Sequence, residues 1–171
     1  MEEKVLDVAE TLIRPAVPAD RDRVANVANA AYALYLERMD KKPAPMTENY
    51  AERIAEGSVF VLETKPDWAD TERKEPSIEG FIVLLPEKDA LLLDNVAVTP
   101  AAQGRGYGKM LIAFAERRAR EAGFRRISLY TNEVMTENLR LYPHLGYAET
   151  HRAEAKGFNR IFFSKELYSR S

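Results

Sequence analysis

Three glycines in five residues, Gly104, Gly106 and Gly108, separate a segment typical of a strand from a segment typical of a helix. Glycine permits positive φ and lets the backbone approach a ligand closely. The first amides of a helix have no intrahelical acceptor, and with the helix dipole they favour anions. Arg105 and Lys109 add two cations. The turn therefore predicts a phosphate or pyrophosphate site, although a tight turn that binds nothing could have the same glycines.

Two common phosphate motifs do not fit this turn. The dinucleotide pattern GxGxxG would need a glycine at Lys109. The P-loop GxxxxGK[ST] would need a glycine at Gln103 and a serine or threonine at Met110. The magnesium-binding hydroxyl is thus missing, which disfavours ATP or GTP chemistry of that type. The pattern that matches is Q-x-x-G-x-G, from Gln103 to Gly108.

The segments around the turn alternate between helical and strand periods, which predicts an α/β or α+β class with a mixed sheet. A polar segment at 65–77, with two prolines, is expected to be a surface loop. The expected helices are 20–35, 47–54, 106–122 and 136–145. The expected strands are 11–14, 58–64, 78–85, 90–98, 126–130, 147–152 and 160–165.

Two strand pairings follow from the connections. The segments 78–85 and 90–98 are joined by a short turn-forming link, which predicts an antiparallel hairpin. The helix 106–122 makes a crossover from 90–98 to 126–130, which predicts that these two strands are parallel.

Within the helix 106–122, Glu116 and Arg120 are four residues apart. This spacing brings opposite charges together on one helical face. We expect the pair on the solvent side, opposite the apolar face that contains Leu111 and Phe114.

Composition excludes several classes of protein. The 171 residues suit a single domain, 1–171, with 1–10 as a lead-in. The net charge of -2 shows no basic surplus for nucleic acid. Without cysteine there is no disulfide or thiolate catalysis, and two histidines without an HExxH pattern disfavour a metal site. No signal-peptide pattern or membrane-length apolar run occurs, so we expect a cytoplasmic protein with no membrane partner.

The stretch from Asn95 to Lys109 resembles the acetyl-CoA motif of the GNAT superfamily of N-acetyltransferases. The order of elements from Leu12 to Leu167 is similar as well. The resemblance implies a central mixed, mostly antiparallel sheet with a splayed parallel pair and flanking helices. It implies acetyl-CoA as co-substrate and direct transfer of an acetyl group to a primary amine of a small molecule or peptide. Many relatives form homodimers, so a homodimer is one expected state.

The resemblance also implies which residues bind the co-substrate. In the family, the strand before the turn carries a bulge, and its backbone amides bind the pantetheine arm. A backbone amide there can also stabilise a developing oxyanion. Gln103 would either bind the pyrophosphate or only order the turn. The strand positions are Val96, Ala97 and Val98, and the turn positions are Gln103, Gly104, Arg105, Gly106, Tyr107, Gly108 and Lys109.

A second family motif matches Leu141 to Tyr147. By resemblance, Tyr142 is the general acid toward the leaving thiolate; alternatively it is a core tyrosine. A phenol with a pKa of about 10 stays protonated at neutral pH and can donate. Many relatives carry an asparagine where this chain has Met135, and Asn138, one helical turn before Tyr142, is the expected substitute.

The acceptor amine needs a group that takes its proton. We expect Asp94 in this role, with a structural acid as the alternative and with Glu133 and Glu149 as weaker candidates. The absence of cysteine and of a GxSxG elbow argues against an acyl-enzyme. A CoA-binding module without catalysis is the alternative function. Expected walls of the acceptor site are Tyr32, Tyr35, Arg38, Pro45 and Met46, although the helical spacing of the two tyrosines could equally make them core residues.

Overall fold

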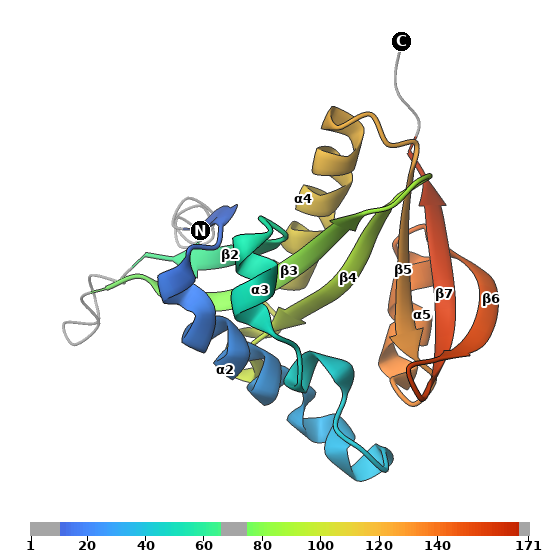
Figure 1. Ribbon diagram of the computed structural model, residues 1–171, viewed down its shortest axis with the longest axis horizontal. Coiled ribbons are helices and arrows are strands. Elements are labelled where there is room, and N and C mark those ends of the chain that lie inside the picture. The colour runs from blue at the N-terminus through green and yellow to red at the C-terminus, as the bar shows by residue number, and fades with distance from the viewer. Residues whose placement is uncertain (1–10, 66–74, 168–171) are drawn as a thin grey trace.

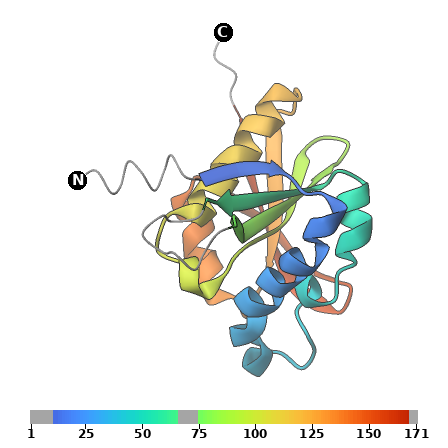
Figure 2. The same ribbon diagram turned by 90° about the vertical axis from the view of Figure 1, so that its left-hand side faces the viewer.

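The structure, a computed structural model, describes residues 11–65 and 75–167. The expected lead-in 1–10 and residues 66–74 of the expected loop lie outside this range. Seven strands form one sheet in the order β1-β2-β3-β4-β5-β7-β6 (Figures 1 and 2). They are β1 (Thr11–Pro15), β2 (Val59–Thr64), β3 (Ser77–Pro86), β4 (Leu91–Val98), β5 (Arg126–Asn132), β6 (Ala148–Ala155) and β7 (Phe158–Glu166).

The α-helices cover the two faces of the sheet. In Figure 1, α2 and α3 lie on one face of the first four strands and α4 on the other, whereas α5 packs near β5 and β6. Short 3-10 helices join several elements. The α-helices are α2 (Arg21–Tyr32), α3 (Tyr50–Ala55), α4 (Tyr107–Glu121) and α5 (Thr136–His144), and the 3-10 helices are Pro18–Asp20, Ala33–Arg38, Ala44–Met46 and Pro100–Ala102.

Two apolar clusters hold these layers together. Val24 of α2 and Phe81 of β3 belong to the cluster beneath α2 and α3. Leu111 of α4 and Ile82 of β3 belong to the larger cluster beneath α4 and α5. Phe81 and Ile82 are neighbours in sequence and fully buried on opposite faces, as the alternation of a strand requires. The sheet is therefore buried on both sides where the site lies.

The sheet is antiparallel except between β4 and β5, which confirms the predicted hairpin and the predicted parallel pair. The parallel pairing covers only three positions and ends at Leu93↔Leu129. On the other edge of β4, Val83 pairs with Asn95 and Leu84 with Leu93, so Asp94 is the extra residue of a β-bulge. Beyond this bulge β4 and β5 diverge (Figure 1). The expected splayed parallel pair is thus confirmed.

Some local expectations are wrong. Glu116 is not on the solvent side: it is 9% exposed, accepts from the Tyr147 hydroxyl at 2.8 Å and pairs with Lys165 at 3.1 Å. The helix expected from residue 47 begins at Tyr50, because the Asn49 side chain accepts from the Glu52 amide at 3.1 Å and caps it.

Among the described residues, no helix has the length and apolar character needed to cross a membrane.

Candidate functional site

The divergence of β4 from β5 opens a cleft of about 1560 Å³ that reaches both faces of the sheet. On the α4 side its lining includes Gly104, Gly108 and Tyr142. On the α2 side the lining includes Tyr32 and Asp94. A cleft of this form can admit two ligands from opposite faces and bring their reactive ends together beside β4.

The glycine turn forms one mouth of this cleft. Gly104 and Gly106 have φ of 87° and 85°, which other L-residues rarely adopt. Gly106 is the N-cap of α4, and a Cβ atom added at Gly104, Gly106 or Gly108 would meet no atom within 4 Å. The space beside these three Cα atoms is therefore open, and the first amides of α4 have no intrahelical acceptor. Lys109 lines the cleft with the glycines. Arg105 is exposed but is not among the lining residues.

Gln103 and Tyr107 play structural parts in the turn. The Gln103 side chain donates to the Val98 carbonyl at 3.1 Å, so it ties the end of β4 to the turn. The Tyr107 side chain is buried in the cluster beneath α4. Of the expected strand positions, Val96 and Val98 pack against this same cluster, whereas Ala97 belongs to the cluster beneath α2. Their backbone lies beyond the last pair with β5 and borders the cleft.

Asp94, the bulge residue, meets β5 across the split. The Tyr130 hydroxyl donates to Asp94 Oδ1 at 2.7 Å. Burial, followed by the charge of Asp94, raises the pKa of Tyr130 above its ordinary value. The phenol therefore stays protonated and holds one carboxylate oxygen. For Asp94 Oδ2, no hydrogen-bond or ion-pair partner exists among the described residues.

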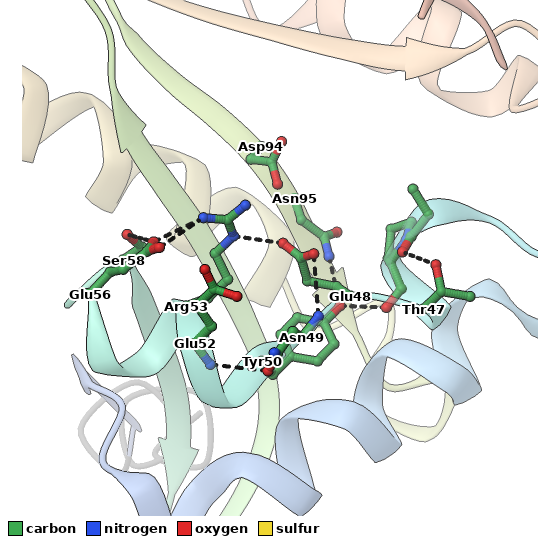
Figure 3. A network of polar contacts seen from close by, with 12 residues as sticks. Thr47, Glu48, Asn49, Tyr50, Glu52, Arg53, Glu56, Ser58, Asp94 and Asn95 are labelled. Carbon is green, nitrogen blue, oxygen red and sulfur yellow. Dashed lines mark hydrogen bonds and ion pairs between the residues drawn. The ribbon is translucent and has the colours of Figure 1, made fainter. Parts of the chain in front are cut away.

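Asn95, the next residue, points to the α2 side and joins three elements. Tyr32 of α2 donates to Asn95 Oδ1 at 2.8 Å, and Asn95 Nδ2 donates to the Tyr50 hydroxyl at 3.2 Å. Tyr50 in turn donates to the Pro45 carbonyl at 2.6 Å. In Figure 3, Asn95 reaches toward Tyr50, whereas Asp94 takes no part in the network drawn there. This chain of bonds fixes β4 against α2 and α3 at the bulge.

A charged network lies beside Asn95 (Figure 3). Arg53 of α3 pairs with Glu48 at 2.7 Å and with Glu56 at 2.9 Å. Glu48 and Arg53 both line the cleft. Because each is already paired with the other, this network contributes little uncompensated charge to the cleft.

Tyr142 lies in α5 with its ring packed between Tyr147 and Phe163, at centroid distances of 6.0 and 5.8 Å. It is 5% exposed and lines the cleft. Within the described residues, its hydroxyl has no hydrogen-bond partner. Burial raises the pKa of Tyr142 above the ordinary value. A buried phenol without a partner is unusual, and it is free to donate to a ligand in the cleft.

Asn138 also lines the cleft, near Tyr142. Its Nδ2 donates to the Thr131 hydroxyl of β5 at 3.0 Å. Met135 Sδ lies 4.0 Å from the same nitrogen, and Met135 is buried. In this structure, Asn138 thus contacts β5 rather than the bulged strand.

Three of the five residues expected at the acceptor site line the cleft. Tyr32, Tyr35 and Pro45 line the cleft, whereas Arg38 and Met46 are not among its lining residues. Arg38 instead pairs with Glu137 of α5 at 2.9 Å, in a two-pronged contact. This ion pair links the segment after α2 to α5, on the other side of the split.

Neither of the weaker base candidates lies in the cleft. Glu133 and Glu149 are exposed, and Glu149 pairs with Arg152 at 3.0 Å.

Sequence reasoning missed Tyr130 and Asn95, which hold the bulge on its two sides. The strand alternation puts Tyr130 on the face opposite Leu129, but this does not identify its partner Asp94, which is 36 residues away. In the described part of the chain, no group of three or more acidic or histidine side chains could hold a metal ion.

Comparison with known proteins gives a consistent family match. The model of the acetyltransferase (GNAT) family matches residues 27–147. An uncharacterized N-acetyltransferase of Escherichia coli is 39% identical over 61 residues, which cover 36% of each chain. A mycothiol acetyltransferase of Rhodococcus erythropolis is 31% identical over 140 residues, 78% of this chain and 45% of that protein. The chain thus spans less than half the length of these curated relatives.

A solved structure shows the same fold. The PaiA N-acetyltransferase of Thermoplasma acidophilum, crystallised in complex with coenzyme A, superposes with a TM-score of 0.70. The match covers 91% of this chain and 98% of that chain at 16% identity. At this identity the likeness concerns the fold alone.

Proposed function

The chain belongs to the acetyltransferase (GNAT) family, and from this premise we propose that it is an acetyl-CoA-dependent N-acetyltransferase. Its acceptor would be a primary amine of a small molecule or peptide. The observation that carries the proposal is the cleft between β4 and β5, which joins the glycine turn on one face to Asp94 and Tyr32 on the other. Two substrates can therefore meet beside the bulge.

The residues present fit coenzyme A. The turn offers open amides at a helix start, and side chains do not fill the space before Gly104, Gly106 and Gly108. Gly104 to Lys109 would hold the pyrophosphate, with Arg105 and Lys109 as cations, and Gln103 would order the turn. The backbone of Val96, Ala97 and Val98 would hold the pantetheine arm. Asn138, which lines the cleft beside Tyr142, would add a polar contact.

Acetyl-CoA supplies the acetyl group as a thioester. Asp94 would take the proton of the amine, because Tyr130 holds one of its oxygens and leaves Oδ2 for the substrate. Tyr142 would hold a proton on its hydroxyl for the departing sulfur, since burial keeps the phenol neutral. Much of the rate would come from orienting both substrates in one cleft.

The test has two measurements. Titration calorimetry with acetyl-CoA reports binding, and thiol release across a panel of amines reports transfer. We expect binding and release with at least one amine. Binding without release on any amine would favour the alternative, a CoA-binding module without catalysis. Absence of acetyl-CoA binding would contradict both.

A further inference from the structure

Three charged side chains are buried in the described part of the chain, and they differ in their partners. Asp20 pairs with Arg14 at 2.8 Å, and Glu116 pairs with Lys165 at 3.1 Å. Arg160 of β7 is the third, at 8% exposed. Among the described residues it has neither a hydrogen bond from its guanidinium nor a carboxylate within ion-pair distance. A buried charge is costly unless it is paired, so Arg160 is the exception that needs a reason.

The neighbours of Arg160 place it in the cleft. Its guanidinium lies over the Tyr130 ring, 4.1 Å from the centroid, and 5.8 Å from the centroid of Phe158. All three residues line the cleft. Stacking satisfies the face of a guanidinium but none of its five N–H donors, which lie in the plane at its edges. The donors therefore remain available to a ligand.

Tyr130 connects Arg160 with Asp94. The hydroxyl end of the tyrosine bonds to Asp94, and its ring face carries the guanidinium. The carboxylate of Asp94 and the unpaired guanidinium of Arg160 thus contact the same side chain, one at its hydroxyl and the other over its ring. We propose that Arg160 binds a carboxylate of the acceptor, so that the acceptor is a small amine with its own nearby carboxylate, as in an amino acid. This inference rests on the proposed function, because it identifies the substrate class of the same cleft.

The charges in the cleft favour a carboxylate over a phosphate. A single guanidinium matches one carboxylate through two parallel hydrogen bonds. A phosphate monoester carries a charge near −2 and would also face the carboxylate of Asp94, which lines the same cleft. The monoanion is therefore the better complement.

The aromatic side chains beside Arg160 add apolar contact surface. Phe162 follows two residues later on the same face of β7, and its ring lies 5.8 Å from that of Tyr130. His151 stacks on Phe162 with centroids 4.3 Å apart. These rings give the bound acceptor an apolar wall, so we expect amino acids with apolar side chains to be preferred over glycine.

The test compares matched acceptors. Leucine, leucinamide, 3-methylbutylamine and O-phosphoethanolamine are assayed by thiol release with the wild-type chain and with Arg160→Met, Arg160→Lys and Arg152→Met. The readout is the ratio of kcat/KM for leucine to that for leucinamide. Comparing this ratio between variants cancels the different amine pKa values of the two acceptors. Arg152 lies on the neighbouring strand, is exposed and does not line the cleft, so its variant is the matched control.

We expect Arg160→Met to lower the ratio about 10- to 100-fold, because charge-assisted hydrogen bonds to a carboxylate contribute free energy of this size. Arg160→Lys should keep part of the preference, because it retains charge but loses the fork. Arg152→Met should leave the ratio unchanged. An equal ratio in the wild type and Arg160→Met would overturn the inference, as would an Arg160-dependent preference for O-phosphoethanolamine.

A binding measurement separates this inference from the proposed function. N-acetylleucine and N-acetylleucinamide are titrated into the wild type and Arg160→Met, with circular dichroism to verify folding. If N-acetylleucine binds more tightly than N-acetylleucinamide to the wild type but not to Arg160→Met, the result would support a carboxylate-bearing ligand even if no amine is acetylated. Acetylation of amines without any carboxylate preference would leave the proposed function standing and remove this inference.

Discussion

The Tyr130 hydroxyl donates a 2.7 Å hydrogen bond to Oδ1 of Asp94 across the point where β4 and β5 part. Asp94 is the extra residue of the β4 bulge, and Tyr130 belongs to the first residues of β5 beyond the last parallel pair. The bond therefore spans the opening of the cleft and orients the carboxylate toward the side where the acceptor would bind.

If Asp94 takes the amine proton, Asp94→Asn should lower kcat/KM by about 10²- to 10⁴-fold, the usual contribution of a general base. The asparagine oxygen can still accept from Tyr130, so folding should be retained. Steady-state thiol release together with a thermal melt measures both effects. Glu133→Gln, an exposed carboxylate outside the cleft, is the control and should be silent. Full activity of Asp94→Asn would assign Asp94 a structural role.

Tyr142→Phe should lower kcat by about 10²-fold or more if the hydroxyl is the general acid. Stability should hardly change, since this hydroxyl bonds to no described residue. Tyr147→Phe provides the opposite pattern: its hydroxyl bonds to buried Glu116 at 2.8 Å, so about 1–3 kcal/mol of stability should be lost while kcat is kept. Comparing kcat with denaturant midpoints for the two variants checks this. An unchanged kcat in Tyr142→Phe would show that Tyr142 is a core-packing residue and not the general acid.

Gly108→Glu should weaken acetyl-CoA binding about 10- to 100-fold, because a carboxylate would oppose the pyrophosphate at close range. The same change should stabilise the chain by about 1 kcal/mol, since glutamate favours the first turn of a helix and a Cβ at Gly108 meets nothing within 4 Å. Calorimetry and a thermal melt measure the two effects. Ala113→Glu adds the same charge to an exposed position of α4 and should leave the affinity nearly unchanged. Equal affinities in both variants would place the pyrophosphate elsewhere.

Asp20 predicts a dependence of stability on pH. The Arg14 side chain, together with the Val17 amide, holds the pKa of Asp20 below its ordinary value despite burial. A lowered native pKa stabilises the fold above the unfolded pKa of about 3.9, and this is lost as the pH falls through the native value. Asp20→Asn should therefore cost about 1–3 kcal/mol at pH 7.

The loss of unfolding free energy in Asp20→Asn should become smaller below about pH 4, because the wild-type Asp20 carboxylate then becomes protonated and loses its charge. Denaturant titrations at several pH values measure this. Asp22→Asn is the control, because the Asp22 side chain is 82% exposed and, within 11–65 and 75–167, its ion pair is with the exposed Arg21. A cost for Asp20→Asn that stays constant from pH 7 to acid would contradict the assigned role of the charge.

Sequence reasoning succeeded where the signal was local. The glycine turn and α4 were predicted because their conformation depends on residues within one or two turns. Glu116 was misplaced because its partners, Tyr147 and Lys165, come from 31 and 49 residues away. A solvent-facing i, i+4 pattern cannot reveal such contacts.

Arg160 was predicted only as the start of a strand for the same reason, since its burial depends on Tyr130 from another strand. The expected cytoplasmic location and homodimer stay predictions, as do the assigned roles of the site residues.

The bulge at Asp94 has a consequence for how specificity can change. Because the extra residue shifts the alternation, Leu93 and Val96 both face the α4 cluster, and Asn95 faces α2. One strand thus borders the cleft on two faces, one lined by residues of α4 and α5 and the other by residues of α2 and the β6–β7 hairpin. If the chain is the proposed N-acetyltransferase, substitutions in the second half should change the preferred amine while the half that would bind acetyl-CoA stays intact. Libraries aimed at new acceptors then belong on β7 and the segment after α2.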